Sequence, residues 1–325
     1  MDNMAVYKKT LGFSLRRLGW DVLSVLILGA LCMGGFLIAD KATDNGLIGL
    51  LIGLVIGLGV LVVLLRWVSY QYKAGQIAMI TRGVTEGALP EDVISEGKKA
   101  VKERFLTVAA FFAVTRVIKG VFNEVGRVIT KAGESLGGDT GSTIGSVISS
   151  IISVVVSYLC DCCLGWVFFR SDVKSAKATC EGAVLFFRHW KTLAKNMARV
   201  FIFGLISLAV IGGVFFGIAY LIFSKFPAWF VTLAKEFAET AAKDGTESAG
   251  WQWLTDPGSL TLISAAVVGV IFWSILHSVF IKPFVLTGVL RNYIASGIND
   301  IPGESSFAEL DSKSRKFRKL HAEAV

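Results

Sequence analysis

The sequence is poor in charged residues, which a soluble domain needs on its surface. Charged residues make up 18% of the 325 residues, whereas hydrophobic residues make up 54% and the mean hydropathy is +0.63. This balance excludes an ordinary soluble domain of this length. Residues 47–65 contain no charge and reach the roughly 20 residues needed to cross a hydrocarbon core of about 30 Å. The sequence therefore predicts an integral membrane protein.

Cysteines are also few, and their positions exclude a disulfide framework. The five cysteines are Cys32, Cys160, Cys162, Cys163 and Cys180, and all but the last lie inside predicted spans. None lies where it could join two extracellular loops. The cluster at residues 160–163 resembles a metal site, but consecutive helical side chains point about 100° apart and cannot converge on one ion. We expect no metal there and interpret these cysteines as small apolar packing residues.

The sequence lacks the motifs that mark common catalytic sites. It contains no nucleophile elbow, no phosphate-binding loop, no His-Glu-x-x-His helix and no pair of carboxylates at a workable spacing. His189 and His321 lie in basic surface stretches and indicate no reaction. We therefore predict neither an enzyme nor a bound cofactor.

Basic residues gather in alternate loops, which sets the predicted topology. The linkers at residues 71–104 and 170–199 are rich in lysine and arginine, whereas the loops between the other spans are neutral or acidic. Under the positive-inside rule this pattern predicts six spans with both termini in the cytoplasm. The net charge of +8 thus reflects topology and does not indicate nucleic-acid binding. The predicted spans are residues 20–39, 46–70, 105–129, 143–169, 200–223 and 259–281.

The predicted architecture is an all-α, multi-pass plasma-membrane protein with interfacial helices on its cytoplasmic face. Residues 1–19 form a basic amphipathic segment, residues 20–296 form the transmembrane domain, and residues 297–325 form a polar cytoplasmic tail that we expect to be disordered. Each basic linker carries a Glu-Gly pair ahead of a span, at residues 96–97 and 181–182. This match indicates either a duplicated helix–linker–helix unit or chance.

Glycines and polar residues recur at helical spacing inside the predicted spans. Gly49, Gly53 and Gly57 predict a face on which another helix packs closely. The third span carries a cationic stripe and the fourth a hydroxyl stripe that ends in an acid. Charged side chains at the bilayer centre cost at least about 2.5–3.5 kcal/mol each, so they are rarely present without pairing or function. The residues concerned are Arg116, Lys119, Asn123, Ser153, Ser157 and Asp161.

Arg116 and Asp161 lie at similar depth in these two antiparallel neighbours, so we expect them to pair. Lys119 is an alternative partner, and His277 lies shallower and would join the cluster. Three interpretations remain open. The pair fixes helix register, or it belongs to a water-accessible seam that carries a polar solute or lipid headgroup, or residues 105–129 form a tilted amphipathic helix and not a true crossing.

The working hypothesis is the seam. It makes the protein a transporter or channel for a small polar, anionic or lipid-like solute, acting as a homo-oligomer among membrane lipids, including anionic ones. The alternative is a non-catalytic scaffold or assembly factor that binds lipids or protein partners through its basic cytoplasmic face.

Two short stretches carry a resemblance to a known family. Residues 173–200, with Ser175-Ala176, Phe186-Phe187 and the run from Asn196 to Val200, are similar to the C-terminal half of choline-transporter-like proteins, as are residues 277–280. The order of elements also resembles uncharacterised bacterial multi-pass membrane families. The resemblance implies a helical membrane fold, but the choline-transporter-like family has more spans than we predict here. No site residue is transferred from it.

Overall fold

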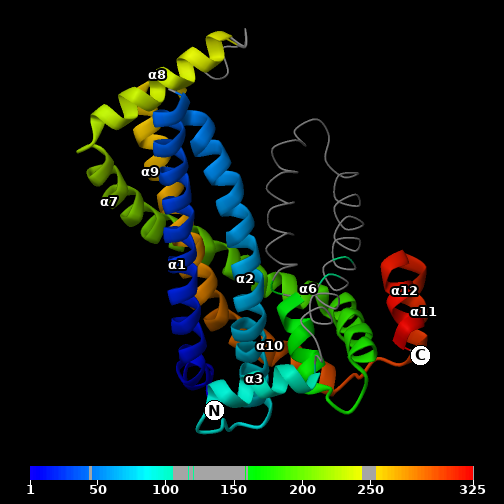
Figure 1. The fold of residues 1–325 in the computed structure, drawn as a ribbon. Coiled ribbons are helices and arrows are strands. Elements are labelled where there is room, and N and C mark those ends of the chain that lie inside the picture. The colour runs from blue at the N-terminus through cyan, green and yellow to red at the C-terminus, as the bar shows by residue number, and fades with distance from the viewer. Residues whose placement is uncertain are drawn as a thin grey trace. The chain divides into compact units, whose positions relative to one another are not determined.

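The computed structural model describes residues 1–43, 46–104, 116, 120, 158, 160–243 and 254–324. Over these ranges all regular secondary structure is helical, as predicted (Figure 1). The described helices outside the candidate spans are α3 (Val93–Arg104), the short helix Cys160–Phe169, α8 (Pro227–Lys243), α11 (Glu304–Lys313) and α12 (Arg315–Ala324).

Four helices of the described residues are long and apolar enough to cross a membrane, as in a membrane-embedded protein. They correspond to the predicted first, second, fifth and sixth spans. The predicted third span lies almost entirely outside the described residues, and of the fourth only residue 158 and residues 160–169 are described, so the count of six stays a prediction. The four candidates are α1 (Asn3–Thr43), the first part of α2 (Gly46–Thr85), the end of α6 (Ser175–Ser207) continued by η1 (Leu208–Gly212) and α7 (Gly213–Phe223), and α9 (Pro257–Leu276) continued by η3 (His277–Ile281) and α10 (Lys282–Ile298).

Helices α1 and α2 are longer than the sequence predicted. They contain 41 and 40 residues, which at 1.5 Å per residue makes each about 60 Å long, twice the hydrocarbon thickness. Residues 1–19 therefore do not form a separate segment but begin the same helix as the first span. No proline precedes Pro90, and α2 ends just before Gly87, whose φ of 69° stops a helix. Without a breaker, each helix continues past its apolar part.

The chain divides into two compact units. Unit 1 comprises Met1–Arg16, Ser69–Phe203 and Phe280–Val325, and unit 2 comprises Arg17–Val68 and Gly204–Val279. Helices α1, α2 and α6 each contribute residues to both. The two units differ in where they place apolar side chains.

Unit 2 exposes many large apolar side chains, as a lipid-facing bundle does, and closes its helix contacts with glycine. A Cβ atom added to Gly49 would lie 2.0 Å from the carbonyl oxygen of Gly35, and one added to Gly53 would lie 2.2 Å from that of Leu31. The α2 glycines thus let α1 approach to backbone contact, which confirms the predicted packing face. A second apolar cluster joins α8 to the neighbouring helix ends through Phe36, Leu47, Phe230, Leu233, Ala234 and Leu260.

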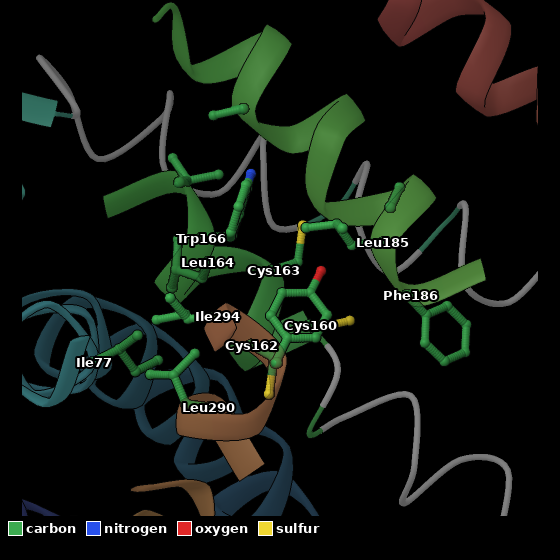
Figure 2. Packing of buried hydrophobic residues seen from close by; sticks show 14 of the residues in the cluster. Ile77, Cys160, Cys162, Cys163, Leu164, Trp166, Leu185, Phe186, Leu290 and Ile294 are labelled. Atoms are coloured by element: carbon green, nitrogen blue, oxygen red, sulfur yellow. The ribbon is translucent and has the colours of Figure 1, made fainter. Parts of the chain in front are cut away.

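Unit 1 buries its apolar side chains in a core. Trp166 and Leu164 of the short helix Cys160–Phe169 pack with Leu185 of α6 and Leu290 of α10 (Figure 2). The thiols of the predicted cysteine cluster lie in this core, as expected of packing residues (Figure 2).

The C-terminal residues are helical, so the expected disorder is wrong. Four apolar residues at helical spacing, two in α11 and two in α12, are buried in the core of unit 1, and the backbone N–H of Phe317 donates to Ser314 Oγ (3.1 Å), which begins α12. Disorder was predicted because basic residues are numerous in this segment and apolar residues are sparse. The four buried residues are Phe307, Leu310, Phe317 and Leu320.

Candidate functional site

Asp161 is the centre of an ion cluster in unit 1. Its Oδ1 lies 2.7 Å from Lys73 Nζ and its Oδ2 lies 2.8 Å from Lys282 Nζ. Lys73 comes from α2 and Lys282 is the first residue of α10, so segments far apart in the sequence meet at one carboxylate. Each oxygen of Asp161 has its own ammonium partner.

Among the described residues, two ammonium groups and one carboxylate meet in this cluster. Lys282 Nζ also lies 5.2 Å from the ring centroid of Tyr158, a cation–π distance, and the tyrosine is buried. The side chains of Asp161 and Lys282 are 6% and 15% exposed, whereas that of Lys73 is 33% exposed. Lys73 is therefore the most exposed of these three charged residues.

The structure differs from the prediction in the partners that it gives Asp161. The described ion pairs of Asp161 are to the two lysines, while Arg116 is exposed. The other residues of the two predicted stripes lie outside the described residues, so the seam between them stays a prediction. These residues are Lys119, Asn123, Ser153 and Ser157.

The two lysines were missed because they lie beyond the predicted ends of their spans. The sequence placed Lys73 and Lys282 at the membrane surface and Asp161 inside the membrane, so the three residues were assigned to different depths. The signal available was the unpaired acid itself, since a carboxylate in an apolar run needs a cation from another helix. It does not identify which helix supplies the cation.

His277 belongs to a different cluster, in unit 2. Its Nδ1 lies 3.2 Å from Ser207 Oγ, and that oxygen also accepts a hydrogen bond from Trp273 Nε1 (2.9 Å). The indole and imidazole ring centroids are 5.3 Å apart. The structure therefore places His277 with a hydroxyl and an indole in unit 2, whereas Asp161 lies in unit 1.

Unit 2 contains a further ion pair, which contacts Ser278, the residue that follows His277. Arg17 Nε is 3.7 Å from Asp21 Oδ2, and the guanidinium donates to both oxygens of Ser278, at 2.6 Å to Oγ and 3.3 Å to the backbone carbonyl. Asp21 is buried. The sequence indicated Arg17 only as an interfacial cation, so this tie between α1 and η3 was not predicted.

Glu181 forms the second buried carboxylate site of unit 1. Its side chain is 1% exposed, accepts a hydrogen bond from Trp166 Nε1 (3.1 Å) and pairs with Arg170 Nη1 (3.1 Å). Burial raises the pKa of the Glu181 carboxyl, and the hydrogen bond from Trp166 and the charge of Arg170 oppose that rise. Both partners lie at the end of the preceding helix, so this site fixes the turn between that helix and α6.

A cavity of about 460 Å³ opens in unit 1 between the end of α2 and α3. Met79, Phe168 and Phe169 form its apolar wall, and charged side chains form its rim. On this rim Arg82 is paired with Glu86 at 2.8 Å. The cavity is thus amphipathic, and Arg82, Glu86, Glu96 and Lys99 on its rim form ion pairs with one another.

Comparison with protein-family models, with curated proteins and with solved structures finds no match.

Proposed function

We propose that the protein is a carrier for a small anionic solute, with its path along the seam between residues 105–129 and 143–169. Lys73 and Lys282 bind the carboxylate or phosphate of the solute, and Asp161 holds the two ammonium groups in place when no solute is bound. The observation that carries the proposal is the single buried carboxylate shared by two lysines.

The two ammonium groups give the anion its binding energy. An ammonium removed from water is costly without a counter-ion, so a site in which two lysines converge on one carboxylate attracts an anion. A monovalent anion entering along the partly exposed Lys73 pairs with its ammonium group. In each transport cycle the solute replaces Asp161 as the partner of a lysine, and Asp161 takes the lysine back when the solute leaves. This alternation fits a carrier better than an open channel. We also propose that this carrier is a multi-pass, oligomeric protein of the plasma membrane.

Lys73→Gln is the sharpest test of transport. We expect the variant, purified and reconstituted into liposomes, to lose at least tenfold in initial uptake of labelled phosphate, lactate or glycerol phosphate, whichever the wild type carries. The fold survives because Asp161 keeps its ion pair with Lys282. Lys73→Arg preserves the charge and retains more uptake than the glutamine variant.

Lys98→Gln is a matched control for this test. Like Lys282 of the cluster, Lys98 has its Nζ 5.2 Å from the centroid of an aromatic ring, here that of Tyr72. Unlike Lys73 and Lys282, it has no ion pair among the described residues. Its replacement leaves uptake within about twofold of wild type. If Lys73→Gln transports at the wild-type rate, or if it unfolds in size-exclusion chromatography, the cluster only fixes helix register and the carrier proposal is wrong.

The exposed face of α12 favours a second candidate function, that of a lipid-binding scaffold. This helix buries Phe317 and Leu320 in unit 1 and exposes four basic side chains, a surface that attracts anionic headgroups. Replacing all four by glutamine lowers the amount of anionic lipid that co-purifies and leaves uptake unchanged. A loss of uptake with no loss of lipid contradicts the scaffold. The four residues are Arg315, Lys316, Arg318 and Lys319.

A further inference from the structure

The cavity between α2 and α3 has the size and the lining of a small-molecule site. Its volume of about 460 Å³ lies within the range of about 300–1,000 Å³ that is usual for ligand pockets. Met79 of α2 is buried in its wall, beside Phe168 and Phe169 at the end of the short helix Cys160–Phe169. All of its lining residues belong to unit 1. The wall suits an apolar group of a ligand.

The charged side chains that line this cavity include one more carboxylate than cations. The cations are Arg82 and Lys99, and three glutamates accompany them. Arg82 pairs with Glu86 (2.8 Å) and Glu96 (3.9 Å), and Glu96 also pairs with Lys99 (4.0 Å). The third glutamate, Glu103, is exposed and has no ion pair among the residues that the structure describes. Glu103 is therefore the carboxylate on this rim that can bind a cation.

The cations next to Glu103 in the sequence are turned to other groups. Lys102 lines a separate cavity with Gln71. Arg104 donates to the backbone carbonyl oxygens of Arg170 (2.9 Å) and Val173 (2.8 Å). Neither residue lines the cavity between α2 and α3. Charge complementarity at the rim thus favours a positively charged ligand.

Hydroxyl groups on the lining indicate which kind of cation fits. Thr81, Thr85 and Ser171 line the cavity. The hydroxyls of Thr81 and Thr85 donate their protons to backbone carbonyl oxygens of α2 (2.8 and 2.9 Å), so their oxygens can still accept. A primary ammonium has three N–H donors and can bind a carboxylate and hydroxyl oxygens together. A quaternary ammonium has no such donor.

The cavity lies past the apolar part of α2. The candidate span in this helix ends at Val63, and the first α2 residue on the cavity is Ala78. At 1.5 Å per residue, about 22 Å of helix separates the two positions. A ligand of this cavity therefore comes from water.

We propose that this cavity binds a small water-soluble primary amine, in its ammonium form, that carries an apolar group. The apolar group packs against Met79, Phe168 and Phe169, and the ammonium donates to Glu103 and to the lining hydroxyls. The Lys73–Asp161–Lys282 cluster shares no residue with this lining. The inference therefore goes beyond the proposed function and does not rest on it.

Benzylamine is the probe for this site, and ligand-observed NMR titration of the full chain in nanodiscs measures its binding. Nanodiscs without protein correct for partition into lipid. We expect benzylamine to bind at least about threefold more tightly than benzyl alcohol, which has no charge, and than benzyltrimethylammonium, which has no N–H donor. Absence of benzylamine binding, or equal binding of benzylamine and either comparison compound, overturns the inference.

Glu103→Gln tests the proposed ion contact. The side chain is exposed, so the fold survives its replacement. We expect the variant to bind benzylamine about threefold to fivefold more weakly than the wild type and to bind benzyl alcohol equally well. Glu91→Gln is the control, because Glu91 is also exposed but does not line the cavity, and it leaves benzylamine binding unchanged. Wild-type affinity in Glu103→Gln contradicts the inference.

Ala100→Leu tests whether the amine lies inside the cavity. Ala100 lines it from α3, so a larger side chain reduces the volume while every charge stays in place. We expect this variant to lose binding of benzylamine, and size-exclusion chromatography checks that it is folded. Folded Ala100→Leu protein that binds benzylamine as the wild type does would show that the amine binds elsewhere, which overturns the inference.

Discussion

Asp161 shows how an ion cluster inside a membrane protein depends on its single acid. Each of its oxygens has its own lysine, so removing the carboxylate leaves two ammonium groups facing each other. Loss of one lysine leaves a complete pair. The three residues are therefore unequal in their effect on stability, although all belong to the same site.

Asp161→Asn should destabilise the protein more than either lysine variant. Breaking a buried ion pair by removing one partner costs about 3–5 kcal/mol, and here the partner is shared. We expect thermal unfolding of the asparagine variant in detergent to occur well below that of Lys73→Gln. Equal melting temperatures would show that the ion cluster contributes little to folding.

Individual residues also mark the limit of sequence-based inference at this site. The acid was identified because a carboxylate inside an apolar run is expensive. Its partners were not, because Lys73 and Lys282 lie on helices that continue past the predicted ends of their spans. His277 was identified as a polar residue inside a predicted span. Its contact with Ser207 lies at two π-helical turns, which no sequence pattern predicted.

At the scale of helices, small residues decide which elements touch. The glycine spacing in α2 predicted a packing face, and α1 occupies it at backbone contact. The two Glu-Gly pairs have a comparable setting, since Gly97 lies against Gly75 and Phe13, while Gly182 lies against Cys163 and Tyr293. In each case the glutamate pairs with an arginine near the end of the preceding helix, at 3.9 Å and 3.1 Å. Both Glu-Gly pairs thus have a glutamate–arginine contact, and duplication and chance both stay open as interpretations.

Gly53→Ala should loosen the contact between α1 and α2. The added methyl group would lie 2.2 Å from the carbonyl oxygen of Leu31, so one backbone must move. We expect a lower melting temperature in detergent for this variant. Gly59→Ala in the same helix is the control, because nothing lies within 4 Å of its Cβ, and the better helix propensity of alanine stabilises it by up to about 1 kcal/mol. Equal destabilisation by both would exclude a packing role for Gly53.

Docking of α12 onto α11 should weaken as the pH rises. His321 Nδ1 lies 2.7 Å from Asp311 and Nε2 lies 3.3 Å from Glu304, and the hydrogen bond to Asp311, assisted by Glu304, raises the pKa of His321. A raised pKa means that the folded state favours the imidazolium. Its contribution is complete below the ordinary pKa near 6.5 and is lost as the pH rises through the raised value.

Hydrogen exchange of the α12 amides measures this effect. After correction for intrinsic exchange rates, protection at pH 8.5 should be lower than at pH 6. Asp311→Asn removes the main partner of His321, so protection in this variant should depend less on pH. Protection that is independent of pH in the wild type would contradict the assignment.

At the scale of the whole molecule, four membrane-crossing candidates are described and six crossings are predicted. Cysteine-accessibility labelling on a background without native cysteines distinguishes these counts. With six spans and cytoplasmic termini, a cysteine at position 134 reacts with an impermeant reagent added outside intact cells, whereas one at position 98 reacts only after permeabilisation. If position 134 is labelled only from inside, residues 105–169 do not cross the membrane twice.

The chain passes between the two compact units four times, after residues 16, 68, 203 and 279, and each passage lies within a helix. Consequently neither unit is complete until most of the protein has been synthesised. Unit 2 needs residues up to Val279, and the beginning of α1 packs in a core that also includes α10 and α12. At about 5–20 residues per second the N-terminal helix waits on the order of tens of seconds for these partners. A deletion of α12 would therefore disturb the core in which the beginning of α1 packs.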